Sequence, residues 1–122
     1  MVANGYFVHN PATGETESSR DFDSDDEIRT KLERSAAAYE RWRRVPLAER
    51  ASALAKLAEG LRAESKQLAH ILAREVGKPL DQGEFEVELA ASIASHYASN
   101  AEKLLAPNPI EVSGAERVEV HY

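Results

Sequence analysis

The sequence predicts a predominantly helical α+β fold in which a β-hairpin, four α-helices and a second β-hairpin follow one another. Between residues 24 and 105, apolar residues recur every three or four positions, as one buried face of an α-helix requires. At both ends of the chain, short alternating segments lie next to Pro and Gly residues, which is typical of hairpins. A chain of 122 residues has the size of one domain, so we treat residues 1–122 as a single segment.

The N-terminal hairpin is predicted over residues 6–20. The segment from Tyr6 to His9 alternates as a strand, and the segment from Glu15 to Arg20 continues in an extended form. Asn10 to Gly14 lie between these segments and place Pro and Gly at turn positions.

The first helix is predicted to begin after Ser24. Ser24 and Glu27 have the spacing of a capping box, in which each side chain accepts a hydrogen bond from the backbone of the other residue. The acids of residues 21–25 also alternate as in a calcium loop, but Asp26 stands where Gly is needed and Leu32 where Glu is needed. We therefore interpret these acids as part of a helix start. The predicted buried face consists of Ile28, Leu32, Ala36, Tyr39 and Trp42.

The second and third helices are bounded by Pro and Gly residues. Pro46 ends the first helix and can occupy the first turn of the second. Gly77 can adopt the left-handed conformation that ends the third helix, and Pro79 blocks its continuation. The apolar positions are Leu47, Ala51, Leu54, Ala58 and Leu61 in the second helix, and Leu68, Ile71, Leu72 and Val76 in the third.

The fourth helix is predicted from about Leu80 to Leu105, and a second hairpin follows it. Gly83 is expected to weaken the first turns of this helix by roughly 1 kcal/mol relative to alanine. Residues 106–109, which include two prolines, end the helix, and the segments Ile110–Val112 and Arg117–Tyr122 alternate as strands. The predicted apolar stripe of the helix is Val87, Ala90, Ala91, Ala94, Tyr97, Ala101 and Leu105.

The composition favours a part of a larger assembly over a self-contained domain. Hydrophobic residues make up 43% of the chain, but many are alanines, which bury little area at roughly 25 cal/mol per Å². Two hairpins with open strand edges also leave backbone N–H and C=O groups without partners. We expect these edges to bind the remainder of a larger protein or further copies of the chain.

Several classes of function are disfavoured by the residues that the sequence contains. The net charge of −6 argues against a surface that binds nucleic acid. No apolar run reaches the ~20 residues that a membrane span needs, so we expect a cytoplasmic protein. There is no cysteine, and the glycines form no phosphate-binding loop. The four histidines are too scattered for a local metal site, and Glu84, Glu86 and Glu88 point to different sides of a helix. We therefore predict no catalytic, cofactor-binding or metal-binding residue in this chain.

An ordered set of motifs resembles the N-terminal region of the aldehyde dehydrogenase superfamily. The set comprises Asn10 to Glu15, Trp42 with Pro46, Glu49 to Ala51, and Glu75 to Pro79, followed by Glu86 to Glu88, His96 to Ala98, and Ala101 with Glu102. The resemblance covers nearly the whole chain and is greatest to the succinate-semialdehyde dehydrogenase-like members. Each motif also has a structural reading, because each marks a turn or the end of a helix.

The resemblance implies that this chain corresponds to one part of a much longer enzyme. Family members have a Rossmann-like domain for NAD or NADP, a catalytic domain and a hairpin that mediates oligomerisation, and their catalytic cysteine, glutamate base and cofactor loop lie far downstream. This segment would then supply the helical layer of the cofactor domain and an oligomerisation-type hairpin. The long helix borders the substrate tunnel in the family, which makes Leu89 and Ile93 candidate residues of the tunnel wall.

Two hypotheses of different classes follow. In the first, the chain is part of an NAD(P)-dependent aldehyde dehydrogenase, either a truncated product or one polypeptide of a split enzyme, and it is inactive alone. Succinate semialdehyde is its candidate substrate. In the second, it is a stand-alone helical interaction module that descends from that family and binds a partner through its open strands.

Overall fold

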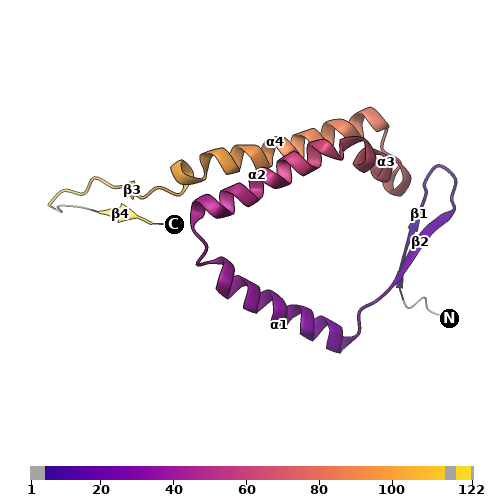
Figure 1. The fold of residues 1–122 in the computed structure, drawn as a ribbon, viewed down its shortest axis with the longest axis horizontal. Helices are drawn as coiled ribbons and strands as arrows, with labels where there is room; N and C mark the ends of the chain where they lie inside the picture. Colours follow the sequence, from indigo (N-terminus) through magenta and orange to yellow (C-terminus); the bar gives the residue numbers. More distant parts are fainter. Residues whose placement is uncertain (1–4, 115–117, 122) are drawn as a thin grey trace.

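The fold follows the predicted order of one hairpin, four helices and a second hairpin. The computed structural model describes residues 5–114 and 118–121. Its elements are β1 (Gly5–His9), β2 (Thr16–Asp21), α1 (Asp25–Trp42), α2 (Leu47–Ala63), α3 (Ser65–Val76), α4 (Leu80–Leu104), β3 (Asn108–Pro109) and β4 (Glu119–Val120). Helices α2 and α4 lie side by side, α3 packs at one end of α4, and the two hairpins extend from opposite ends of the molecule (Figure 1). The predicted α+β, mainly helical class is confirmed.

The β1–β2 hairpin has the predicted turn. The strands are antiparallel, with Gly5 opposite Asp21, and the register shifts between Val8 and His9. The turn is closed by a hydrogen bond from the Gly14 N–H to the Asn10 C=O at 2.7 Å, and Gly14 has a φ of 75°. Glycine adopts this left-handed conformation without the steric cost that other residues meet.

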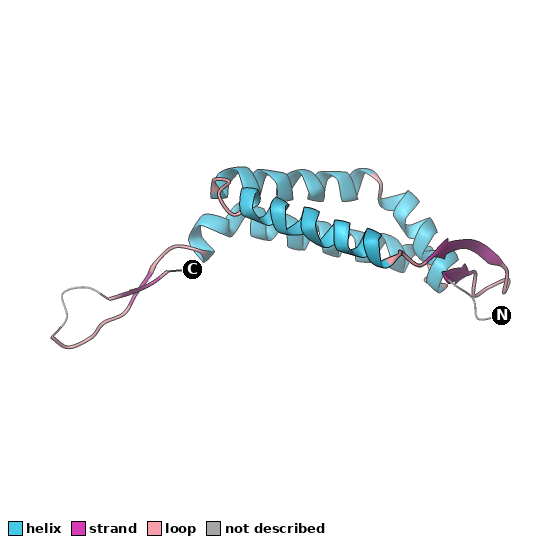
Figure 2. Cartoon of the chain, turned by 90° about the horizontal axis from the view of Figure 1, so that it is seen from below, coloured by secondary structure: helices cyan, strands magenta, loops and turns pink. Residues whose placement is uncertain are grey.

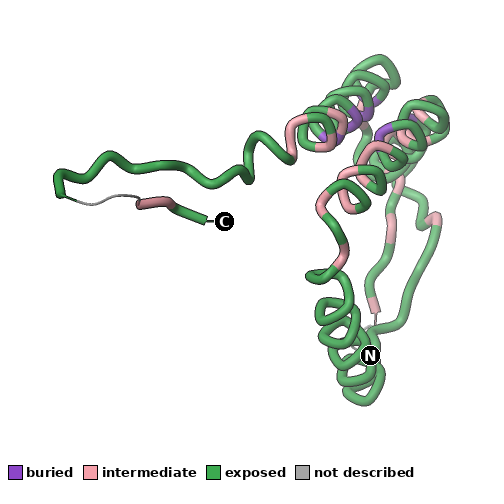
Figure 3. The backbone as a smooth tube through the Cα atoms, turned by 60° about the vertical axis from the view of Figure 1, so that its left-hand side comes forward, coloured by how far each residue is buried: buried purple, intermediate pink, exposed green. Residues whose placement is uncertain are grey.

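Helix α1 begins at the predicted cap, but its predicted buried face is wrong. The Ser24 side chain accepts a hydrogen bond from the Glu27 N–H at 3.3 Å, and the Glu27 carboxylate accepts one from the Ser24 N–H at 2.8 Å. No residue of α1 is buried, and Leu32 and Tyr39 are 65% and 60% exposed. The physical reason is that α1 contacts no other described helix or strand (Figures 1 and 3). All five predicted core positions, Ile28, Leu32, Ala36, Tyr39 and Trp42, are therefore exposed.

The core lies between α2 and α4 and consists mainly of alanines. Ala58 of α2 is buried together with Ala91 and Ala94 of α4, and Leu54 and Leu61 pack against them. Small side chains let the two helix axes approach closely, so the contact is tight but the buried area is small. The predicted face of α2 is confirmed, because Leu47, Ala51, Leu54 and Leu61 are half-buried around Ala58.

The predicted stripe of α4 is only partly correct. Val87, Ala91 and Ala94 are buried and Ala101 is half-buried, whereas Ala90, Tyr97 and Leu105 are exposed. The physical reason is that α2 and α3, the two helices that contact α4, cover only part of this stripe (Figure 2).

Gly83 is buried against α3, a contact that its helix propensity does not predict. A Cβ at this position would lie 3.1 Å from the Cα and the Cβ of Ala69, which is closer than ordinary contact. Gly83 thus permits the close approach of α3 and α4, an effect that its low helix propensity does not reveal.

The end of α3 matches the predicted cap. Gly77 has φ and ψ of 70° and 23°, and its N–H donates to the Ala73 C=O at 3.0 Å. This is the left-handed cap that glycine favours.

The second hairpin exists, but its described strands are shorter than predicted, and the first of them begins two residues earlier. Asn108 pairs with Val120, and the Ile110 N–H donates to the Val118 C=O at 2.8 Å. Strand β3 lies in the Pro-containing segment that the sequence predicts only as the end of the helix. An edge strand tolerates Pro109, because the N–H that proline lacks need not pair there. The predicted strand Ile110–Val112 is not one, while Arg117 and Tyr122 lie outside the described residues.

Candidate functional site

The titratable side chains do not gather into a catalytic or metal-binding cluster in the part of the chain that the structure describes. No group of three or more His, Cys, Asp or Glu residues could hold a metal ion there. His9 lies 3.1 Å from the Thr16 hydroxyl, His96 packs edge-on against Tyr97, and His121 lies 3.3 Å from Glu119. None of the described helices is long and apolar enough to cross a membrane. The candidate functional features are therefore surfaces of the helices.

Leu89 and Ile93, the predicted residues of a tunnel wall, lie one turn apart on an exposed face of α4. They are 49% and 50% exposed, and Phe85, one turn earlier, is 70% exposed. At 100° per residue, these three residues lie on the side of α4 opposite to Val87 and Ala91, which face the core. Phe85 is not among the predicted wall residues, although it lies four residues before Leu89, the same spacing that relates Leu89 to Ile93.

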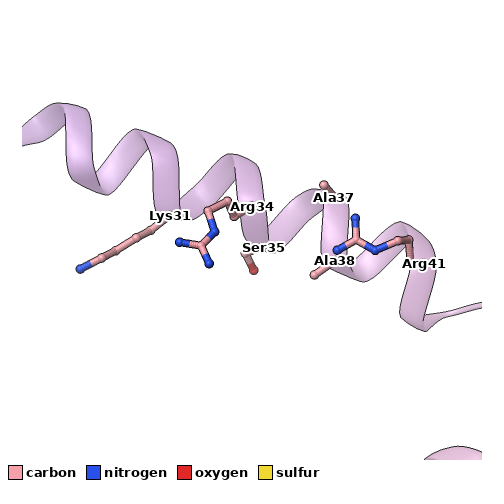
Figure 4. Close-up of a pocket in the computed structure, with 6 residues that line it drawn as sticks. All are labelled: Lys31, Arg34, Ser35, Ala37, Ala38 and Arg41. Carbon is pink, nitrogen blue, oxygen red and sulfur yellow. The ribbon is translucent and has the colours of Figure 1, made fainter.

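The face of α1 that carries Lys31, Arg34 and Arg41 forms a shallow hollow. Its described lining residues, which also include Ser35, Ala37 and Ala38, all come from this one helix (Figure 4). Because a single helix supplies only one wall, the hollow is an open surface and not an enclosed binding site. We assign it no ligand.

An apolar groove lies between the start of α2 and the end of α4. Its described lining residues are Leu47, Arg50, Ala51 and Leu54 from α2, Tyr97, Ala101 and Leu104 from α4, and Leu105, which follows α4 directly. The Nε atom of Arg50 is buried and has no hydrogen-bond partner. The groove was not predicted, because it forms only when two segments about 50 residues apart in sequence meet.

An ion-pair network joins α2 to α4 near the middle of the chain. Arg62 donates from Nε to both carboxylate oxygens of Glu88, at 3.1 and 3.2 Å, and from Nη1 to the Ser95 hydroxyl at 3.0 Å. The hydrogen bonds from Arg62, and then from the Ser92 hydroxyl, hold the pKa of Glu88 below its ordinary value. Because α2 and α4 also share the core, this network adds a polar contact between two helices that already pack together.

The neighbouring carboxylate of Glu86 pairs with Lys78 at the start of α4. Glu86 and Glu88 thus bind cations on different sides of the helix, as predicted from their spacing, and they do not form one acid/base pair.

A second ion pair attaches the first hairpin to α3. The Glu17 carboxylate lies 2.5 Å from the Arg74 guanidinium and accepts a hydrogen bond from the Asn10 side chain at 2.9 Å. The hydrogen bond from Arg74, followed by that from Asn10, lowers the pKa of Glu17. The motifs that contain Asn10 and Gly77 therefore lie at one junction of the fold, where a Cβ added at Gly77 would lie 2.9 Å from Cγ of Pro11.

Comparison with known proteins identifies the family. The aldehyde dehydrogenase family model matches residues 3–122. The chain is 34% identical over 109 residues to the NAD(P)+ succinate semialdehyde dehydrogenase Sad of Escherichia coli K12, covering 89% of this chain and 24% of that protein. It is 36% identical over 112 residues to the NADP(+) succinate-semialdehyde dehydrogenase of Deinococcus radiodurans, covering 92% of this chain and 24% of that protein.

A solved structure shares the arrangement of helices and strands. The succinic semialdehyde dehydrogenase of Streptococcus pyogenes, in complex with NADP+, superposes with a TM-score of 0.88 at 30% identity and covers 95% of this chain and 26% of its own. The chain therefore spans about a quarter of the length of the relatives that it matches. The resemblance drawn from the motifs is confirmed, and the chain belongs to the aldehyde dehydrogenase family.

Proposed function

We propose that this chain is the N-terminal part of an NAD(P)-dependent aldehyde dehydrogenase, in which it has a structural and oligomerising role and supplies no catalytic group. Succinate semialdehyde is the proposed substrate of the complete enzyme, because two relatives at 34% and 36% identity are named for it. In this proposal α2, α3 and α4 form the helical layer of the cofactor domain, and β3 and β4 form the oligomerisation hairpin.

The observation that carries the proposal is the large apolar surface of the helices. Among the described residues, the buried hydrophobic side chains are Ala58, Ala69, Val87, Ala91 and Ala94. Larger side chains such as Trp42 and Phe85 are exposed, although full burial of one such side chain stabilises a protein by roughly 1.5–3 kcal/mol. Such a surface favours a chain that packs against a larger body.

The chemistry of the chain is consistent with a role without catalysis. Aldehyde oxidation by a covalent route needs a nucleophile such as a cysteine thiolate, and the sequence contains no cysteine. The six glycines include no Gly-rich loop that could place backbone N–H groups around a pyrophosphate, so these residues do not fit a dinucleotide site. Leu89 and Ile93, exposed on α4, remain the candidate tunnel wall.

A chimera tests this function directly. Residues 1–122 would replace the matched quarter of the Deinococcus radiodurans enzyme, and reduction of NADP+ by succinate semialdehyde would be followed by absorbance. We expect activity from the chimera and none above the blank from the 122-residue chain alone.

Two controls make the result decisive. The native relative and its downstream three quarters alone give the upper and lower limits of activity. A chimera that stays soluble but inactive and does not assemble would overturn the proposal and favour the stand-alone interaction module. Activity from the isolated chain would overturn it as well.

A further inference from the structure

The apolar groove between the start of α2 and the end of α4 contains one charged side chain among its described lining residues. Leu47, Leu54, Tyr97 and Leu104 belong to its apolar wall, and Arg50 of α2 also lines the groove. The start of α2 is where the chain arrives from α1, and the end of α4 is where the chain leaves the helices toward β3 (Figure 1). The groove is therefore at the border of the layer and not inside it.

Arg50 has a buried hydrogen-bond donor without a partner among the described residues. Its Nε atom is buried without an acceptor, and no described side chain forms an ion pair with its guanidinium. Buried donors in native proteins nearly always have a partner, because an unpaired one destabilises the fold.

We propose that the groove binds a segment of the downstream polypeptide of the enzyme, and that an aspartate or glutamate of this segment pairs with Arg50. This inference rests on the proposed function. Apolar side chains of the segment would fill the space between Leu54 and Tyr97. The carboxylate would accept hydrogen bonds from the guanidinium edge that includes Nε, a geometry that arginine forms readily with carboxylates.

Two observations favour this occupant. The chain spans about a quarter of its relatives, so most of the polypeptide that could cover the groove lies beyond the matched region of those proteins. The half-buried Arg50 also favours an acidic partner, because a carboxylate that accepts a hydrogen bond from Nε would satisfy its buried donor. Arg50 is therefore the residue that would fix where the segment docks.

The test compares Arg50→Leu in two settings, the isolated chain and the chimera with the Deinococcus radiodurans downstream part. In the isolated chain we expect the urea midpoint of unfolding to stay the same or to rise, because the variant removes an unpaired buried donor. In the chimera we expect the thermal midpoint to fall by several degrees, because the carboxylate loses its partner. Lys56→Leu is the matched control on the same helix, since Lys56 is exposed, and it should change neither midpoint.

A pH series identifies the acceptor as a carboxylate. The pairing would lower the pKa of that carboxyl in the folded chimera, so its contribution is present at neutral pH and is lost as the pH falls through the lowered pKa. The difference between wild-type and Arg50→Leu chimeras should therefore shrink as the pH falls below about 4, the ordinary range of carboxyl pKa values. A difference that does not depend on pH would overturn the proposed carboxylate.

The remaining outcomes separate this inference from the proposed function. An inactive wild-type chimera would refute the proposed function itself. An active chimera whose stability is unaffected by Arg50→Leu would refute only the docking inference. Sedimentation of the isolated chain gives a third result: a dimer that Arg50→Leu dissociates would show that a second copy occupies the groove and would overturn the proposed occupant.

Discussion

Gly77 joins two motifs of the sequence at one point of the fold. Its φ of 70° ends α3, and a Cβ at this position would lie 2.9 Å from Cγ of Pro11 in the β1–β2 turn. Both a backbone requirement and a packing requirement therefore favour glycine here.

We expect Gly77→Ala to destabilise the chain by about 1–2 kcal/mol, the cost of the left-handed conformation for an L-residue. Gly60→Ala is the control with the opposite sign. Gly60 is in the interior of α2 with nothing within 4 Å of an added Cβ, so alanine should stabilise by roughly 0.5–1 kcal/mol. Urea unfolding followed by circular dichroism measures both. Equal midpoints for Gly77→Ala and the wild type would contradict this assignment.

Ser24 acts on α1 alone, because α1 contacts no other described element. We expect Ser24→Ala to shift the helix–coil equilibrium of α1 by on the order of 1 kcal/mol toward the coil. Faster amide exchange at the start of α1 should report the change, while the unfolding midpoint of the α2–α4 layer stays the same. Ser35→Ala, at an exposed position of the same helix, should not weaken the helix. Unchanged exchange in Ser24→Ala would argue against the cap.

The Glu88 carboxylate gives the α2–α4 contact a pH dependence. Arg62 lowers the pKa of Glu88 in the folded chain, so the contribution of the pair is present above the ordinary pKa of glutamate. The contribution is lost as the pH falls through the lowered pKa of the folded state. We expect Glu88→Gln to lower the urea midpoint at neutral pH, and we expect its difference from the wild type to shrink as the pH falls below about 4.3, the ordinary pKa of glutamate. A difference that persists at the lower pH would contradict this prediction.

At the scale of the elements, the contact between α3 and α4 depends on the absence of a side chain at Gly83. We expect Gly83→Leu to destabilise the layer by about 1–3 kcal/mol, because a side chain must push Ala69 away. Ala90→Leu, on an exposed face of α4, is the matched control and should be nearly neutral. Thermal unfolding of the two variants provides the comparison. A Gly83→Leu variant as stable as Ala90→Leu would show that α3 and α4 do not pack closely.

At the scale of the whole molecule, the two hairpins keep open strand edges beyond the helical layer. The β3–β4 hairpin projects away from the helices, and its neighbouring residues Ile110 and Val112 are exposed (Figures 1 and 3). Exposed edges with β-branched residues recruit other chains.

We therefore expect deletion of residues 110–122 to shift the chain toward monomer in sedimentation or light scattering. The helical circular-dichroism signal should remain, because the deleted residues lie outside the four helices. Replacing Ile110 and Val112 by lysine in the full chain should have the same effect without shortening it. A full chain that is already a compact monomer at high concentration would contradict the prediction and support the stand-alone module.

The sequence by itself determined the order of the elements and most of their ends. The capping box at Ser24 and the glycine cap at Gly77 are local features, since their hydrogen bonds join residues within a few positions of each other. The same holds for the turn at Asn10 to Gly14. Family membership also followed from the sequence, because it depends on ordered motifs and not on contacts.

The tertiary structure alone decided which apolar residues are covered. Periodicity gives the face of a helix that could be buried, but burial requires a second element, and α1 has none in the described part of the chain. The same reason explains why the packing of Gly83 against α3 and the apolar groove between α2 and α4 were not predicted. Each depends on a side chain or backbone that is distant in the sequence and adjacent only after folding.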